Sequence, residues 1–449
     1  MSTKPMSNKK KVFVLILAFI FCAIASAAIP SFLLTNYYNK EIKESKTKWQ
    51  KVRVADPILY SDNGYIDYAN EVYLDDETYP DLKEMGMFWA KWDDANEKVI
   101  LHDADSDEGA KLVDADKPTI IFIHGMLLDG HYQQEMFYLS PRATDTTEFN
   151  ITTERVSLIH LWILEGWNVG VFHYNRFASE PMPTPIEAKI WANDGPEKVR
   201  IRHEDDTTSH VTEYSVAEHF AAEYLRAMNL LPQKMGKKEI RIAAHSMGGE
   251  LMTAGIFLLT ELASDGQLDY RHLPNRFSML DPYFCVNLMI DGKLNYLGPS
   301  GITVRWTGKG LYKDNTGYTM IECLKDFVAN GIAIDYYTHK ESTLHLGMPD
   351  DIKSELKRLS TFSMINPNYA SYGKGYNVIA HGHNGVRDWY YCSIRGDLAK
   401  YEGANTIFNV APTAKTPTDV IRAQKGMSFR MTTGYSTVHS NDDIFVDFN

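Results

Sequence analysis

The stretch that decides the fold is Lys238-Glu-Ile-Arg-Ile-Ala-Ala-His-Ser-Met-Gly-Gly-Glu250, because it predicts a strand, a sharp turn and a helix in succession. Residues 239–244 form a short segment with apolar residues at alternate positions, whereas residues 250–262 form a longer, almost wholly apolar run. This change of period indicates a buried strand that leads into a buried helix. Ser246 lies at the turn between them.

The turn itself, Ala244-His-Ser-Met-Gly248, matches a nucleophile elbow with alanine at the first small position. Small residues are needed there because a bulky side chain would strike the neighbouring strand or helix. The serine hydroxyl would then stand above the sheet edge, at the positive end of the helix. There the backbone N–H of Met247 can hold a developing oxyanion. The alternative is an ordinary strand-to-helix turn with a serine cap.

The elbow resembles that of the α/β-hydrolase superfamily, and of its lipase and esterase branch in particular, where a histidine before the serine is common. The resemblance implies a mostly parallel sheet with helices on both faces, and ester hydrolysis by a Ser-His-Asp triad without metal or organic cofactor. It also assigns the second oxyanion donor to the backbone N–H of Met126, after a buried strand ending in His124-Gly125. We interpret His124 as a structural residue, because the resemblance places the catalytic base near the C-terminus.

The acid is sought downstream of the serine, since this superfold orders its triad as serine, acid, histidine. Asp281 follows the apolar stretch 276–280 and resembles the Leu-Asp-Pro segment of pancreatic and lipoprotein lipases. Asp335 is the alternative, in a strand expected at 332–337, and Glu341 comes just after that strand. We favour Asp281 because ligands and catalytic side chains collect where strands end at the carboxyl edge of such sheets.

The candidate bases lie in the segment 376–391, which we interpret as a last strand, a Gly-rich loop and the start of an aromatic helix. His383 precedes Arg387-Asp-Trp-Tyr-Tyr391 and is similar to the base of the lipases. The interval from histidine to arginine is longer here than in those families, which leaves His381 open as the alternative.

Composition limits the partners. The chain has 449 residues, 44% of them hydrophobic, and a formal net charge of −12, which argues against nucleic acid as a partner. Its four cysteines match no zinc spacing, so buried structural thiols are expected. The acidic cluster 103–107 lacks a full calcium-ligand spacing and is interpreted as a solvated loop. The sequence leaves the oligomeric state open.

The amino end predicts export. Lys9-Lys10-Lys11 precede an uncharged apolar run at 12–29, which is typical of a signal peptide or an N-terminal membrane anchor within residues 1–30. In both cases the rest of the chain is expected outside the cytoplasm, secreted or membrane-anchored.

The remaining organisation follows from the motifs. Residues 31–115 are expected to form a flank with the first strands, residues 116–395 the hydrolase core, and residues 396–449 a C-terminal extension. Within the core, the proline-rich excursion 176–210 predicts a cap or lid over the acyl site.

The sequence therefore predicts an exported lipase or carboxylesterase, with Ser246, His383 and Asp281 as triad and an acyl-ester or lipid substrate, in contact with a membrane or lipid interface. The same residues would serve an acyltransferase or a peptidase. A non-catalytic binding module at the membrane surface is the alternative of a different class.

Overall fold

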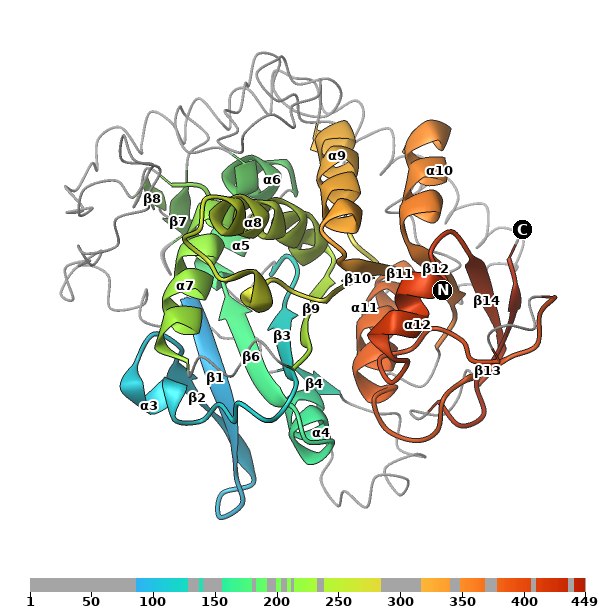
Figure 1. The fold of residues 1–449 in the computed structure, drawn as a ribbon, viewed down its shortest axis with the longest axis horizontal. Helices are drawn as coiled ribbons and strands as arrows, with labels where there is room; N and C mark the ends of the chain where they lie inside the picture. The colour runs from blue at the N-terminus through green and yellow to red at the C-terminus, as the bar shows by residue number, and fades with distance from the viewer. Residues whose placement is uncertain are drawn as a thin grey trace, which may run out of the picture.

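The dominant feature of the molecule is one eleven-stranded sheet in the order β13-β15-β14-β12-β11-β10-β9-β3-β6-β1-β2 (Figure 1). The computed structural model describes residues 86–127, 137–139, 156–179, 183–191, 199–202, 208–210, 214–231, 238–283, 316–339, 348–367, 378–404, 409–434 and 440–448. The predicted export segment 1–30 lies outside these residues, as do Cys22, Cys285 and Glu341.

The centre of the sheet is parallel, as the resemblance implied. Its strands are β6 (Asn168–His173), β3 (Thr119–Ile123), β9 (Ile240–His245), β10 (Arg276–Leu280), β11 (Ala333–His339), β12 (Thr361–Ile365) and β14 (Ser428–Thr433). At one end the hairpin of β1 (Gly86–Asp93) and β2 (Lys98–Asp103) joins β6 antiparallel. At the other end β15 (Ile444–Asp447) is antiparallel to β14 and parallel to β13 (Lys400–Tyr401).

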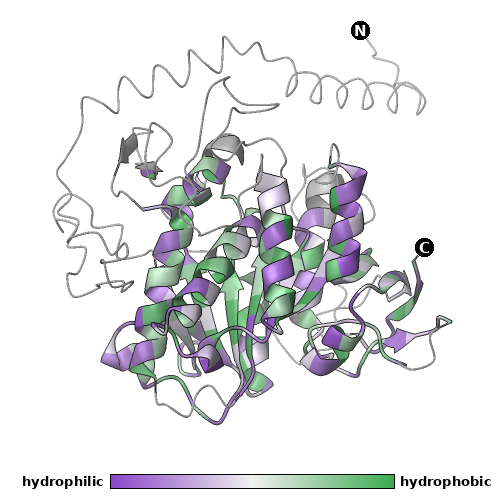
Figure 2. Cartoon of the chain, turned by 45° about the horizontal axis from the view of Figure 1, so that its top comes forward, coloured by the Kyte–Doolittle hydropathy of each residue, from purple (hydrophilic) through white to green (hydrophobic). Residues whose placement is uncertain are grey.

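Helices cover both faces of the sheet, because its central strands are apolar on both sides. In β3, Ile121 and Ile123 belong to one buried core, whereas Ile120 and Phe122 belong to the other. The first core is shared with helices α7 (Val216–Leu230), α8 (Met247–Ser264), α9 (Thr316–Ala329) and α10 (Asp350–Leu359). The second is shared with α4 (Leu158–Leu164) and α11 (Val378–Cys392). Figure 2 shows the central strands as hydrophobic and the outer helices as mixed in hydropathy.

Two reciprocal hydrogen bonds cap the start of α7. Ser215 Oγ accepts a hydrogen bond from the backbone N–H of Glu218 at 3.2 Å, and the Glu218 carboxylate accepts one from the backbone N–H of Ser215 at 2.7 Å. This reciprocal pair is a capping box, and it satisfies two of the N–H groups that a helix start leaves without partners.

The excursion 176–210 contains several short elements. They are α5 (Asn175–Ala178), α6 (Pro183–Trp191), β7 (Arg200–Arg202) and β8 (Thr208–His210), the last two forming a small antiparallel pair. Helix α6 packs on α8, where the Trp191 indole N–H donates to Glu250 Oε1 at 2.6 Å (Figure 1). The other short elements are α3 (Asp107–Ala110), β4 (Tyr138–Leu139), β5 (Val156–Ser157), the 3-10 turn η3 (Tyr270–His272) and α12 (Thr418–Ala423).

One prediction was wrong: the segment from Val378 onward is helical, not a last strand followed by a loop. The position of the next parallel strand after β11 is taken by β12 instead. The glycines that suggested a loop allow close packing of α11, since a Cβ on Gly382 would lie 2.3 Å from His339 Nδ1 at the end of β11. A short apolar run does not by itself distinguish a strand from a buried helix.

The carboxy-terminal segment is joined to the sheet rather than standing apart from it. Its strands β13, β14 and β15 extend the sheet beyond β12. In addition, the Arg276 guanidinium in β10 donates to the backbone carbonyls of Thr413 and Thr416, both at 2.7 Å. Among the described residues, no helix is long and apolar enough to cross a bilayer.

Candidate active site

Ser246 lies at a strained turn between β9 and α8. Its backbone has φ 56° and ψ −126°, and its side chain makes no capping hydrogen bond to the helix. An ordinary cap residue has extended backbone angles and a side chain that accepts from the first turn, so the capping alternative is wrong. A non-glycine residue with such angles costs about 1–3 kcal/mol, and this strain is found where the surrounding structure imposes it.

The elbow is held tightly by the loop after β3. A Cβ on Gly125 would lie 2.6 Å from Ser246 Cβ, and one on Gly248 would lie 2.4 Å from the His124 carbonyl oxygen. Because these approaches leave no room for a side chain, both glycines are required by packing. The loop that carries Met126 therefore lies directly beside the elbow that carries Met247.

Asp281 and His383 are in contact at the same edge of the sheet. His383 Nδ1 lies 2.7 Å from Asp281 Oδ2, and the Thr338 hydroxyl donates to Asp281 Oδ1 at 2.7 Å. Asp281 follows β10 and is fully buried, whereas the His383 side chain is 18% exposed. Asp281 also has a positive φ of 41°, and its N–H donates to the Tyr337 carbonyl in β11. A parallel sheet with a strained serine elbow and an Asp–His pair after the next strand decides the architecture. The chain has the α/β-hydrolase fold.

Several solved structures match part of the chain at low sequence identity. A thioesterase domain from the curacin biosynthetic pathway is 14% identical, with 54% of this chain and 80% of that one covered and a TM-score of 0.25. Est1E from Butyrivibrio proteoclasticus, solved with ferulic acid, is 10% identical, with 56% and 78% covered and a TM-score of 0.24. A monoacylglycerol lipase from Paleococcus ferrophilus is 11% identical, with 54% and 81% covered and a TM-score of 0.25.

The fold assignment rests on the parallel sheet and the serine elbow. No family model matches the chain. No curated protein matches it.

Asp335, the alternative acid, has a different environment in this hydrolase fold. Its two carboxylate oxygens accept from Arg276 at 3.1 and 2.5 Å, and Ser278 donates to it at 2.7 Å. Both side chains of the ion pair are fully buried. Asp335 also lies within β11, about 13 Å before the end of the strand at ~3.3 Å per residue. Its contacts join neighbouring strands rather than a histidine at the sheet edge.

Two other histidines, His124 and His381, were named from the sequence. His124 Nε2 accepts the backbone N–H of Tyr174 at 3.1 Å, and Nδ1 lies 2.7 Å from the Gly125 carbonyl. Both ring nitrogens are thus engaged by backbone, as the structural interpretation of His124 predicted. The side chain of His381 lies outside the described residues, although its backbone is part of α11.

Sequence reasoning missed two residues of this site. The hydroxyl of Thr338 bonds the Asp281 carboxylate, and His245 Nε2 lies 3.2 Å from the backbone oxygen of His383. Burial, together with the positive charge of Arg387, lowers the pKa of His245 well below its usual value. The signal for His245 was its place beside the serine, whereas nothing local marks Thr338, which meets Asp281 only through the pairing of β10 with β11.

Burial favours the neutral form of a carboxyl group in the first turn of α8. Burial and the neighbouring Glu187 raise the pKa of Glu250 well above its usual value, and its Oε1 accepts from Trp191. A neutral side chain there leaves the positive end of the α8 dipole, which begins just after Ser246, without an opposing negative charge.

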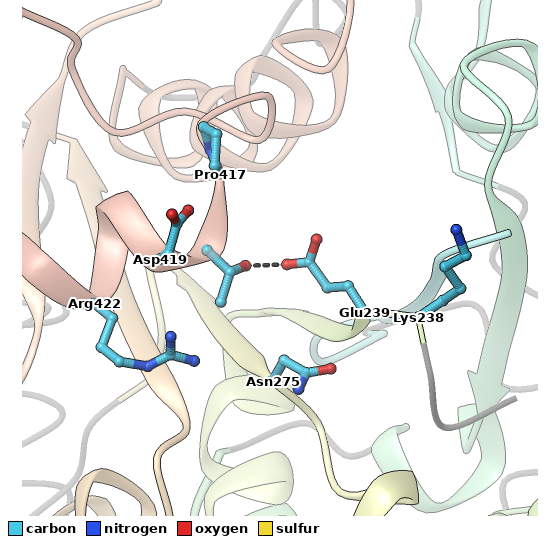
Figure 3. A pocket seen from close by; sticks show the side chains of 7 residues that line it. Lys238, Glu239, Asn275, Pro417, Asp419 and Arg422 are labelled. Atoms are coloured by element: carbon cyan, nitrogen blue, oxygen red, sulfur yellow. Dashed lines mark hydrogen bonds between the residues drawn. The ribbon is translucent and has the colours of Figure 1, made fainter.

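The pocket in Figure 3 lies elsewhere, at the amino ends of β9 and β10, and none of the predicted site residues lines it. Its volume is about 370 Å³, and its lining is Lys238, Glu239, Asn275, Pro417, Thr418, Asp419 and Arg422. The Glu239 carboxylate is engaged by the Thr418 hydroxyl and by Arg241. Because Ser246 follows the carboxyl end of β9, this pocket and the candidate active site lie at opposite edges of the sheet.

The cysteines and the acidic cluster 103–107 were the other candidate functional groups in the sequence. Cys323 and Cys392 are buried free thiols whose pKa is raised by burial, as expected of structural cysteines. In the acidic cluster, Ser106 caps α3 by accepting from the backbone N–H of Gly109. Within the described part of the chain, no three His, Cys, Asp or Glu side chains are placed to hold a metal ion.

Proposed function

We propose that the chain is a serine ester hydrolase in which Ser246 is the nucleophile, His383 the general base and Asp281 the residue that orients the base. The observation that carries the proposal is the 2.7 Å contact between His383 Nδ1 and Asp281 Oδ2, formed beside the strained elbow. A carboxylate that accepts from Nδ1–H fixes the tautomer in which Nε2 is free to take a proton.

The proposed reaction uses these three residues in two steps, acylation and deacylation. Ser246 Oγ attacks the acyl carbonyl carbon while its proton passes to His383 Nε2, and the oxyanion is held by the N–H groups of Met126 and Met247. Collapse of the tetrahedral intermediate breaks the ester C–O bond, and His383 returns the proton to the leaving alcohol. Water, deprotonated by the same histidine, then attacks the acyl enzyme, and the second tetrahedral intermediate releases the carboxylic acid as His383 returns that proton to Ser246 Oγ.

The direct test is hydrolysis of a p-nitrophenyl ester series by the wild type and by Ser246→Ala. We expect the variant to lose at least ~10³-fold in kcat, since the nucleophile is removed. A fluorophosphonate probe should label the wild type and not the variant. Equal turnover in both proteins would overturn the proposal.

A lipid-like acyl substrate is the finer part of the proposal. It is supported by the apolar surroundings of the elbow and by the packing of α6, within the predicted lid, on the elbow helix α8. The test replaces residues 192–198, which follow α6 in the sequence, by a Gly-Ser linker. The replacement should change the ratio of kcat/KM between long-chain and short-chain esters. An unchanged ratio would contradict the proposal of a lid.

We further propose that the protein is exported, with its catalytic part outside the cytoplasm and facing a membrane or lipid interface. The support is the lysine cluster and the apolar run within residues 1–30. Cell fractionation, with N-terminal sequencing of the mature protein, tests this. Recovery of the whole pool in the cytoplasm with an intact amino end would contradict it.

A further inference from the structure

His245, the residue before the candidate nucleophile, touches the candidate base in two ways. Its Nε2 lies 3.2 Å from the backbone oxygen of His383, and the two rings lie 4.4 Å apart between centroids, tilted by 36°. His245 is the last residue of β9, whereas His383 belongs to α11, so the contact joins the nucleophile strand to the base helix. Only 5% of His245 is exposed.

The chemistry of this contact is fixed by its partner. A carbonyl oxygen only accepts, so Nε2 of His245 must carry a hydrogen and donate it. Burial and the nearby Arg387 guanidinium lower the pKa of His245 well below its usual value, which favours the neutral ring. It therefore offers a fixed donor and a neutral aromatic face to His383, and adds no positive charge of its own.

We infer that His245 is a positioning residue of the proposed hydrolysis: its Nε2–H bond to the His383 backbone holds the base in register with Ser246. The inference rests on the proposed function. Asp281 fixes the ring of His383 from the end of β10, and His245 fixes its backbone from the end of β9. The adjacent residues 245 and 246 thus carry the nucleophile and set the position of the group that deprotonates it. A displacement of ~1 Å in such a pair can cost ~100-fold in rate.

The experiment compares three substitutions in the full chain. In His245→Gln the amide nitrogen takes the place of Nε2 and keeps the donor. In His245→Asn the amide reaches only the place of Nδ1, and in His245→Phe the ring stays but the donor is lost. We measure kcat and KM on p-nitrophenyl butyrate, and we record the low-field proton resonance of the His383–Asp281 hydrogen bond by NMR.

We expect His245→Gln to stay within about threefold of the wild-type kcat, and His245→Asn and His245→Phe to lose about 10- to 100-fold with KM changed less than about threefold. The low-field resonance should persist in the Gln variant and be lost or broadened in the other two. If His245 served only the fold, all three variants would lose stability, and the kcat of the Gln variant would not differ from that of the Asn and Phe variants.

Equal kcat in the Gln and Asn variants would overturn the inference, and so would failure of both to fold, because the residue would then serve the core rather than His383. If the wild type hydrolyses esters and either of these results is obtained, the inference is overturned but the proposed function is not. A wild type that turns over no ester and behaves as Ser246→Ala overturns the proposed function as well.

Discussion

Two buried aspartates, one just after β10 and one within the neighbouring β11, bond to chemically different partners. Asp281, just after β10, bonds the imidazole of His383 and the hydroxyl of Thr338. Asp335, within β11, bonds the guanidinium of Arg276 and the hydroxyl of Ser278. Arginine keeps its charge at all working pH values, so the Asp335 pair is permanent, whereas an imidazole gains and loses a proton near neutrality. The partner, rather than the residue type, therefore separates an aspartate that can serve catalysis from one that serves the fold.

The largest expected effect is that of Asp281→Asn on activity. The amide preserves the shape but no longer selects the tautomer of His383 or stabilises its imidazolium, so we expect kcat to fall by about 10³- to 10⁴-fold. Steady-state hydrolysis of p-nitrophenyl butyrate measures this. Unfolding in urea serves as the control for an intact fold, and a kcat within tenfold of wild type would contradict the assignment.

The matched change, Asp335→Asn, should act on stability instead. It leaves the Arg276 charge buried without its carboxylate, which costs about 3–5 kcal/mol of unfolding free energy. Urea unfolding followed by fluorescence gives this value. The folded fraction should keep kcat within about threefold of wild type, and if activity vanished at unchanged stability, the roles of the two aspartates would be reversed.

A third buried aspartate, Asp443, extends the comparison to a carboxyl group that is bonded by an indole N–H. Trp389 Nε1 donates to its Oδ2 at 2.9 Å, and among the described residues its Oδ1 finds no hydrogen-bond partner. Burial, with a smaller contribution from Asp442, raises its pKa to about 8. The folded protein then binds more protons here than the unfolded chain between about pH 4 and pH 8. Stability should therefore fall as pH rises through that window, by up to ~1.4 kcal/mol per pH unit.

Asp443→Asn tests this by removing the titrating group. The difference in unfolding free energy between variant and wild type should shift in favour of the variant from pH 6 to pH 8, and level off above pH 8. Urea unfolding at a series of pH values measures it. Parallel pH curves for the two proteins would mean that Asp443 is ionised in the fold.

The smallest expected effect is that of Thr338→Val, which removes the donor to Asp281 Oδ1 and keeps the branched shape. We expect kcat to fall about tenfold, equivalent to about 1.4 kcal/mol, because the carboxylate is less firmly held. Thr361→Val is the control: that hydroxyl donates to the Ile421 carbonyl, away from Asp281. If both variants kept wild-type kcat, the Thr338 bond would contribute nothing to the site.

The local part of the prediction was accurate because its signals are local. The strands β9 and β10 and the helix after Ser246 each follow from short-range periodicity. The segment 376–391 failed for the same reason, since Val378 and the glycines suit a strand and loop locally, whereas packing of α11 against β11 makes the segment helical.

The sequence by itself determined the elbow at Ser246 and an apolar parallel sheet, because each depends on residues close together in the chain. Only the tertiary structure decided the partners of Asp281 and Asp335, and the contact of His245 with His383. Those pairs are separated by 102, 59 and 138 positions, so they exist only once the strands are in register and α11 lies across their ends.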